Sequence, residues 1–324
     1  MAATPHTRAS RIWRRSRLDG ILVALSLAQF ATTFGLACEW ASMSLPGRLG
    51  SFVLLVCMTA YNIIVLSHLF THVPWFKAAG LNSLISMVNS ANAGQSVQAY
   101  ELQHVRNHHR YNNDAKDADG TTRDVSSTFR KGVKGEHASL FEYVCVGAWK
   151  TWLGSLRECI SMGPGCCLGS RERELRAWLS RSESRRNAEL RQIQLDRLAR
   201  CVVTVALLAI SWRWTLECYL PAFYFAFMLV NVQNYYEHYG ANPGDRGADS
   251  VSYYGRFYNL FTFNDGFHQE HHLRPSSHWR QLPNVRVSEG KGLAVERVVS
   301  PVPAVLGFLH RGRPLLHRSA PSQP

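Results

Sequence analysis

Three short motifs along the chain place histidines at fixed spacing, and these motifs are where its chemistry is to be sought. The second motif, ELQHVRNHHR at residues 101–110, puts three imidazoles into six positions. Neutral imidazole is the commonest metal ligand among side chains, and it suits iron, copper, zinc and nickel. The candidate metal ligands are nine histidines: His68 and His72; His104, His108 and His109; His238; and His268, His271 and His272.

The spacing within the motifs suits either two ligands on one metal ion or one ligand on each of two ions. His68 and His72 are four residues apart, so on a helix they lie on one face about 6 Å from each other. His104 and His108 repeat that spacing, and the third motif, FHQEHH, combines spacings of three and four. A single HxxxH pair on a helix is usually ordinary, but three motifs in one chain indicate a metal site. The histidines outside this set are His6, His137, His278, His310 and His317.

The number of histidines bears on the kind of metal. A structural zinc site closes with four ligands, so nine histidines exceed what one such ion needs. Two ions with open coordination positions fit the count better. Iron fits best chemically, while copper and zinc stay open.

The elements that must position these motifs are strongly apolar. Residues 51–70, for example, contain no Asp, Glu, Lys or Arg. A helix of about 20 residues crosses about 30 Å of hydrocarbon. The mean hydropathy of −0.15 is low only because the middle and the tail of the chain are polar. We expect four membrane spans, near residues 20–38, 51–70, 199–215 and 219–236.

The distribution of Lys and Arg predicts the orientation. Residues 1–19 hold five arginines and residues 71–199 hold eighteen Lys and Arg, whereas the two short loops hold only Arg48 and Arg213. Both termini and the middle section are therefore expected in the cytoplasm. The predicted fold is an all-α membrane protein, with about four transmembrane helices in two hairpins and a cytoplasmic helical cap that carries the histidine motifs. The net charge of +13 then follows from topology and anionic lipid, and no nucleic-acid motif is present.

The remaining segments predict further features. Residues 78–95 are moderately apolar and suit a short embedded helix pair or an interfacial segment. Residues 139–156 resemble a helix in the membrane interface. Residues 110–135 have loop composition, and residues 170–200 have a charged helical pattern.

The motifs resemble those of the integral-membrane fatty acid desaturase and alkane hydroxylase superfamily, which consists of non-haem di-iron oxidases. The resemblance covers about residues 50–285. NYYEHYG at 234–240 is similar to an extra motif of the alkane and xylene monooxygenase branch, in which the histidine is a ninth iron ligand. Departures are Leu69 and Val73 in the first motif, where Glu and Lys are usual, and Gln103 before the second, where Glu is usual. The third motif is more similar to acyl-lipid desaturases and carotenoid ketolases, which leaves the branch open.

The resemblance implies a membrane-bound enzyme that uses two iron ions and dioxygen to remove hydrogen from an unactivated C–H bond of an acyl or alkyl chain. Hydroxylation and desaturation use the same ligands, so substrate placement to within about 1 Å decides between them. An apolar channel would hold the substrate, with Phe223, Phe225, Phe227 and Met228 as candidate lining residues.

The chain has no flavin, haem or iron–sulfur motif, so the electrons are expected from a separate ferredoxin-, rubredoxin- or cytochrome-like carrier and its reductase. Arg106, Arg110, Arg274 and Arg280 are candidate docking residues.

The expected organisation is a basic cytoplasmic tail at 1–19, a membrane di-iron oxidase domain at 20–285, and a polar C-terminal tail at 286–324. The expected location is a membrane, a bacterial inner membrane in particular, with the active site on the cytoplasmic face. Three alternatives remain from the sequence: a carotenoid-type ketolase or hydroxylase, a metal-dependent membrane hydrolase, and a zinc transporter. The exact substrate and the oligomeric state are not readable from the residues.

Overall fold

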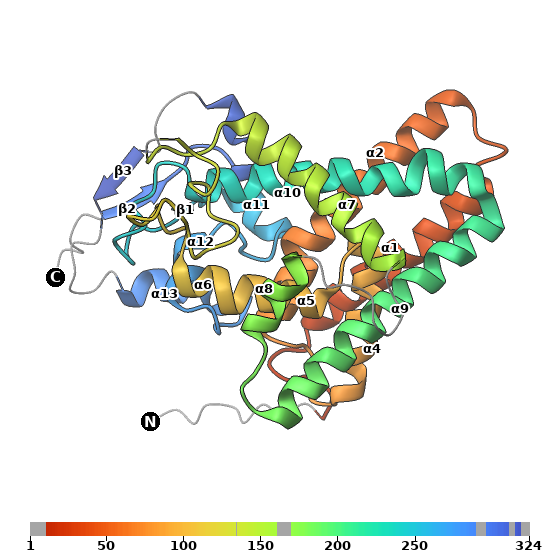
Figure 1. The fold of residues 1–324 in the computed structure, drawn as a ribbon, viewed down its shortest axis with the longest axis horizontal. Coiled ribbons are helices and arrows are strands. Elements are labelled where there is room, and N and C mark those ends of the chain that lie inside the picture. Colours follow the sequence, from red (N-terminus) through yellow and green to blue (C-terminus); the bar gives the residue numbers. More distant parts are fainter. Residues whose placement is uncertain (1–10, 134, 161–169, 290–295, 311–314, 319–324) are drawn as a thin grey trace, which may run out of the picture.

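The computed structural model describes residues 11–133, 135–160, 170–289, 296–310 and 315–318 (Figure 1). Most of the described chain is helical, as predicted. The first half of the predicted basic tail, residues 1–10, lies outside the described residues.

The first predicted hairpin is present. Helix α1 spans Asp19–Glu39, and α2 spans Leu45–Tyr61. Ser44 caps α2 by accepting a hydrogen bond from the Gly47 amide, and Pro46 lies in the first turn, where its missing N–H costs nothing. The π-helical segment η1 (Asn62–Ser67) and the short helix α3 (His68–His72) continue α2 without a break. Helix α1 and the continuous stretch Leu45–His72 are each long and apolar enough to cross a membrane.

A second helical pair follows later in the chain. Helix α9 (Glu183–Trp214) leads through the π-helical segment η4 (Thr215–Tyr219) into α10 (Leu220–His238). The expected short loop at 213–218 is wrong, because these residues are helical. The chain instead bends at Ser211, whose φ of −155° and ψ of 92° leave the helical region. The Ser211 hydroxyl accepts a hydrogen bond from the Trp214 amide at 3.4 Å and so restarts the helix.

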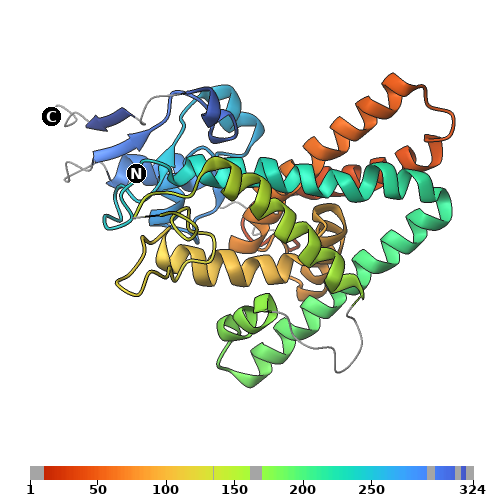
Figure 2. The same cartoon turned by 45° about the horizontal axis from the view of Figure 1, so that its top comes forward.

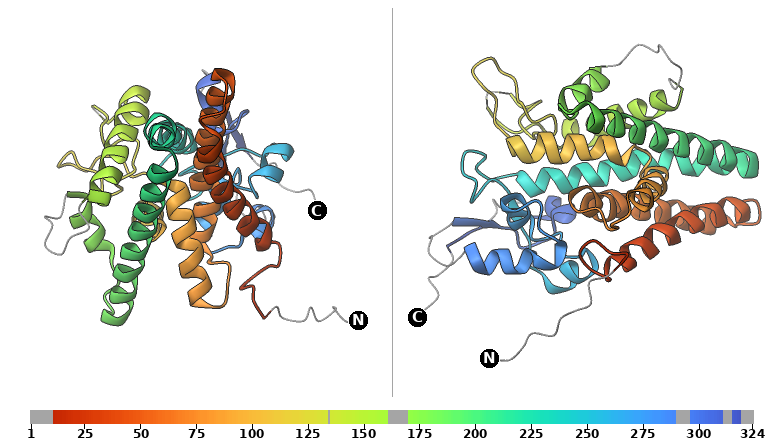
Figure 3. Two further views of the ribbon diagram at one scale, coloured as in Figure 1. Left: turned by 90° about the vertical axis from the view of Figure 1, so that its right-hand side faces the viewer. Right: turned by 90° about the horizontal axis from the view of Figure 1, so that it is seen from below.

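The two helical pairs extend toward the same end of the molecule (Figures 1 and 3). Their outward faces are apolar: Val53 on α2 is 59% exposed, and Val205 and Trp212 on α9 are 65% and 61% exposed. By length and composition, the first two predicted spans are candidate membrane-spanning helices. The assignment of α9 and α10 as the third and fourth, and the cytoplasmic cap, stay predictions.

Residues 78–95 form one helix, α4 (Ala79–Ala93), rather than the pair that the sequence also allowed. It packs against α9 and α1. Gly94 ends it at a φ of +69°, and a Cβ there would lie 2.5 Å from the Phe223 ring, so only glycine fits. Ser96 then caps α5 (Val97–Gln103), which continues through the π-helical segment η2 (His104–His108) into α6 (His109–Tyr111).

A buried polar network connects the apolar helices next to the site. The Asn62 amide at the start of η1 donates to Gln29 Oε1 on α1 at 3.0 Å and to Asn89 Oδ1 on α4 at 3.2 Å. Gln29 in turn donates to the Asn92 carbonyl. Hydrogen bonds of this kind hold helices together where apolar packing gives no orientation, so the network fixes the segment that leads to His68.

Residues 139–156 are largely helical, as expected: η3 (Glu142–Val146) and α7 (Gly147–Ile160) pack along α10. The charged segment forms α8 (Ser170–Trp178) and the first half of α9. Of the predicted loop at 110–135, residues 110 and 111 belong to α6, and residues 112–135 contain no helix or strand among those described, as expected.

The C-terminal part carries the third motif and the only strands in the described residues. After β1 (Val251–Ser252) come α11 (Arg256–Phe261), α12 (His268–Leu273), η5 (Trp279–Gln281) and α13 (Leu282–Glu289). Strand β2 (Glu296–Val299) pairs in parallel with β1, Val251 opposite Val298, and antiparallel with β3 (Leu315–Arg318). The 3₁₀ segment η6 (Ala304–Leu309) packs on α10.

The fold is mostly helical, as predicted, but it also contains one small sheet that the all-α prediction did not include. The β-branched residues Val251, Val298 and Val299 suit its strands. The segment expected as a polar tail supplies two of its strands. Turning the molecule brings the sheet, α12 and the end of α10 into view together (Figure 2). This end, remote from the tips of the helical pairs, carries the histidines.

Candidate metal centre

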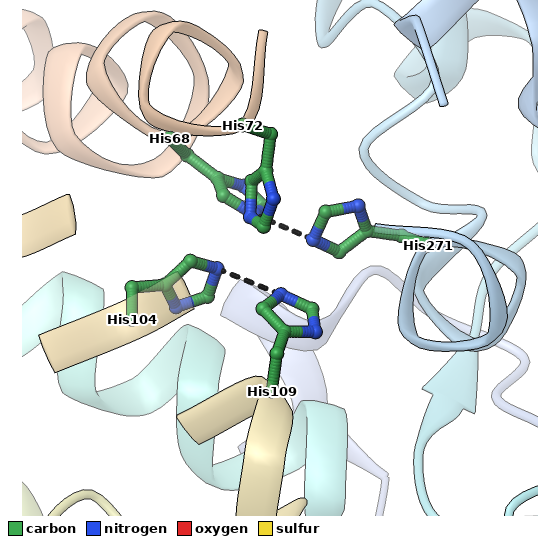
Figure 4. A group of neighbouring side chains, drawn as sticks. All are labelled: His68, His72, His104, His109 and His271. Carbon is green, nitrogen blue, oxygen red and sulfur yellow. Dashed lines mark hydrogen bonds between the residues drawn. The ribbon is translucent and has the colours of Figure 1, made fainter. Parts of the chain in front are cut away.

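All nine histidines singled out by the sequence converge in two adjacent groups. In each group, one potential ligand atom per residue lies within 4.8 Å of the others. The five-histidine group contains His68, His72, His104, His109 and His271 (Figure 4). The four-histidine group contains His108, His238, His268 and His272.

Helical geometry distributes the motifs between the groups. His68 and His72 enter the same group from α3, as their spacing predicts. The second motif behaves differently, because η2 is π-helical and bonds residues five apart. His104 therefore pairs with His109, their Nε2 atoms 3.1 Å apart, while His108 joins the other group. The rings of His104 and His108 still lie side by side, with centroids 5.2 Å apart, and of the two arrangements that their spacing allows, one ligand in each group is the one observed.

The third motif and His238 complete the groups. On α12, His268 and His272 belong to the four-histidine group, and His271 points into the five-histidine group. His238, at the end of α10, comes to within 3.2 Å of His108, measured between their Nε2 atoms. The groups lie side by side, with ring centroids of His109 and His272 4.6 Å apart.

The spacing of the nitrogens fits shared metal ions. His68 Nε2 and His271 Nε2 are 3.0 Å apart, and the other two close pairs are 3.1 and 3.2 Å apart. Two nitrogens that each lie about 2.1 Å from one ion at a right angle are about 3.0 Å apart.

Burial supports the same interpretation. The Nε2 atoms of His72, His268 and His272 are buried and have no hydrogen-bond partner among the described residues. Unpaired buried nitrogens are costly, and ligation of a metal would satisfy them.

Four carboxylates lie behind the imidazoles, beside their Nδ1 atoms. His108 Nδ1 is 2.7 Å from Asp124 Oδ2, and both side chains are fully buried. His68 Nδ1 is 3.3 Å from Asp265 Oδ1. On the four-histidine side, His268 faces Glu237 at 3.5 Å and His272 faces Asp249 at 3.8 Å. A carboxylate hydrogen-bonded to Nδ1, as Asp124 is to His108, fixes the tautomer that presents Nε2 to a metal, whereas the Nδ1 atoms of His268 and His272 make no hydrogen bond among the described residues.

The electrostatics keep several of the imidazoles neutral. Burial, followed by the neighbouring histidines, lowers the pKa of His104, His109 and His271 well below its usual range. Burial alone would raise the pKa of Asp124, but the charge and hydrogen bond of His108, with hydrogen bonds from Ser126, outweigh it and hold that pKa below its usual range. Neutral imidazoles and an ionised Asp124 are the states that metal binding requires.

One amide connects the two groups. Gln233 Nε2 donates to Glu237 Oε1 at 2.6 Å and to Asp265 Oδ2 at 3.2 Å. Glu237 lies behind His268 in the four-histidine group, and Asp265 lies behind His68 in the five-histidine group. Gln233 thereby holds the orientation of one imidazole in each group relative to the other.

A small cavity of about 120 Å³ lies beside the histidines and is lined by His68, His104 and His268. Of the four aromatic and apolar residues expected in a substrate channel, only Phe227 lines it. Phe223 is buried in the core between helices, Met228 packs against that core, and Phe225 is 44% exposed.

The arginines expected to dock a carrier differ from one another. Arg106 is half-buried and bonded to Glu189, with Nη1 3.2 Å from Oε2, so its charge is neutralised. Arg110, Arg274 and Arg280 are exposed.

The sequence analysis identified every histidine of both groups but missed the carboxylates. The positions of Glu237 and Asp265 in the sequence could have indicated a role at the site, because each lies within three residues of a motif histidine. Asp124 and Asp249 lie in loops without a local pattern, and only the fold brings them to the site.

Comparison with known proteins adds an independent finding. The family model described as fatty acid desaturase matches residues 43–294. A search of curated proteins found no match to the chain.

Proposed function

The chain belongs to the fatty acid desaturase family, and from this premise we propose that it is a membrane-bound, oxygen-dependent oxidoreductase. It holds two iron ions with its nine grouped histidines and oxidises an unactivated C–H bond of an acyl or alkyl chain, by desaturation or hydroxylation. Family membership favours this function over the membrane hydrolase and the zinc transporter.

The observation that supports the proposal most is the division of the nine histidines into neighbouring groups of five and four. A single closed zinc site needs four ligands, whereas two groups suit two ions at adjacent positions. When bound, two iron ions would supply the one-electron chemistry that activates dioxygen toward a C–H bond. Iron use is known for the family, and the choice of iron over zinc or copper belongs to this proposal.

The residues of the chain have separable roles in this function. The nine imidazoles hold the ions, and His238 is one of them, as in the hydroxylase branch. Asp124, Asp249, Asp265 and Glu237 accept or face the Nδ1 protons and so keep Nε2 free for ligation. The cavity lined by His68, His104 and His268 borders both groups and is the proposed position of the reacting carbon.

The partners follow from the family and the fold. Members of the family generally need an electron donor and a lipid substrate. We propose a separate ferredoxin-, rubredoxin- or cytochrome-like carrier that docks on a basic face containing Arg110, Arg274 and Arg280. The chain is integral to a membrane, a bacterial inner membrane in this proposal, with both helical pairs inserted and the histidine groups on the cytoplasmic side.

The test is turnover in a defined membrane. The purified protein, loaded with ferrous iron in lipid nanodiscs, receives a ferredoxin, its reductase, a reduced nicotinamide cofactor and oxygen, and the lipids are analysed by mass spectrometry. The expected products have gained one oxygen atom or lost two hydrogens, and they need iron, reductant and oxygen. His104→Ala is the inactive control. Hydrolytic products that form without oxygen would contradict the proposal.

A further inference from the structure

The wall of the cavity beside the histidine groups is partly apolar and partly polar, and the apolar part is the larger. Its volume of about 120 Å³ compares with the roughly 150 Å³ of an apolar protein cavity that holds one benzene ring. It therefore accepts a group of several heavy atoms rather than a long chain. Apolar side chains line one part, contributed by Ile63, Ile64, Phe227 and Val230.

Polar side chains line the remainder, and several of them are already engaged, among them two asparagines. The Asn231 amide donates to the carbonyls of Tyr143 and Val144, and the Asn234 amide donates to the Ser126 carbonyl and the Tyr143 hydroxyl. These bonds hold the wall in place and leave the side-chain oxygens of the two asparagines as acceptors.

Four other polar side chains have no such partner. Within the part of the chain that the structure describes, the side chains of Gln95, Tyr100, Gln103 and Thr151 line the cavity and make no hydrogen bond. Two carboxamides, a phenol and a threonine hydroxyl together offer both donors and acceptors. Polar groups that surround a cavity without mutual bonds are satisfied when a ligand or water supplies the partners.

The charges on the wall exclude an anionic ligand. None of the described residues that line the cavity is Lys or Arg, and two of them, Glu237 and Asp265, are buried acids. A carboxylate or phosphate placed there would be desolvated with no cationic side chain beside it, at high cost, and the charge of the two proposed iron ions is already offset by the four carboxylates behind the imidazoles. The cavity thus differs from a site for the head of a free fatty acid.

We propose that the part of the substrate inside this cavity carries an uncharged carboxamide or hydroxyl, close to the C–H bond that reacts. The proposal rests on the function proposed above, and it names the class of substrate. Gln95, Tyr100, Gln103 and Thr151 recognise the polar group, and the apolar side chains mark where the hydrocarbon part continues. The site selects a bond near a polar group over a bond in the middle of an unsubstituted chain.

Equilibrium binding to the iron-loaded protein in nanodiscs tests this, with dodecanamide, dodecane and dodecanoate as probes and empty nanodiscs as the blank. Dodecanamide is expected to bind at least about tenfold more tightly than either of the other two. Gln103→Leu and Gln95→Leu should each weaken dodecanamide about two- to tenfold, the loss of one hydrogen bond, and leave dodecane unchanged.

Gln98→Leu is the matched control, because Gln98 lies on the same helix as Gln103 but bonds Glu101 and does not line this cavity. Metal content, measured on every variant, identifies any loss of the fold, and the second glutamine keeps the test valid if one variant loses its metals. Equal or tighter binding of dodecane, or a preference for dodecanoate, would overturn the proposal. Binding is measured without turnover, so its outcome is independent of the turnover assay described above. A preference for the amide combined with no oxidised product in that assay would count against the enzyme function and not against this inference.

Discussion

Replacing Asp124 with asparagine should weaken metal binding in the four-histidine group. Asp124 Oδ2 accepts from His108 Nδ1 at 2.7 Å, and the second carboxylate oxygen accepts from the Ser126 amide and hydroxyl, each at 2.8 Å. Asparagine has the same shape as aspartate, but its amide has two possible orientations. In one the NH₂ group faces His108, and in the other it faces Ser126 and removes the acceptor of the two Ser126 hydrogen bonds. An NH₂ group facing Nδ1 favours the tautomer with a proton on Nε2, and that nitrogen cannot bind a metal.

The magnitude follows from the geometry of this pair. Removal of a partner behind a metal-ligating histidine costs about 10–100-fold in metal affinity, or about 1.4–2.7 kcal/mol. The His108 and Asp124 side chains are 1% and 0% exposed, so no solvent replaces the lost bond, and the upper half of that range is expected.

The assay is competition of the purified variant against a chelator of known affinity, with metal counted by mass spectrometry. Asp196→Asn is the matched control, since Asp196 is equally buried and bonds Ser86, Ser96 and Gln192 but touches no histidine. The control should lose stability and keep its metal affinity. Full affinity and full occupancy in Asp124→Asn would refute the reasoning.

Three further predictions concern the ligands, acidity and the electron donor. His238→Ala should lose metal as severely as His271→Ala, whereas His137→Ala and His278→Ala, outside both groups, should keep it; wild-type metal content in the His238 variant would remove that ligand from the set. Burial lowers the pKa of His104, His109 and His271, so an unfolded chain takes up protons below about pH 6.5 that the metal-free folded chain does not. The stability present above that pH is therefore lost as the pH falls, and a thermal midpoint of metal-free protein that is unchanged between about pH 7.5 and 5.5 would contradict this. Turnover should require an added carrier, and its apparent affinity should fall with ionic strength because salt screens charges beyond about 8–10 Å; salt-independent kinetics would exclude the basic docking face.

The sequence predicted the ligands because histidine spacing is local information. His68 and His72 on one helical turn need only a helix to come together, and the apolar stretch 51–70 indicates that helix. The same local reasoning could not decide whether His104 and His108 enter one group or two, because a π-helical turn brings His104 to His109 instead. No residue type marks such a turn in the sequence.

The parts that could not be predicted depend on long-range packing. Asp124 reaches His108 through a loop whose register is set by bonds such as Asp114 to the Arg123 and Asp124 amides. Strand β2 pairs with β1 across more than forty residues of sequence. A loop was predicted around Arg213, but helical hydrogen bonding continues through Arg213 and η4, and the chain bends at Ser211 instead. Amino-acid composition alone does not reveal this continuation of the helix.

Metal analysis of the purified chain tests the central claim most directly. Protein produced with iron available and counted by mass spectrometry should contain about two irons per chain, and substitution of one histidine from either group should reduce that number. One zinc per chain, or iron that persists after His104→Ala and His268→Ala are combined, would contradict a di-iron centre built from the nine histidines.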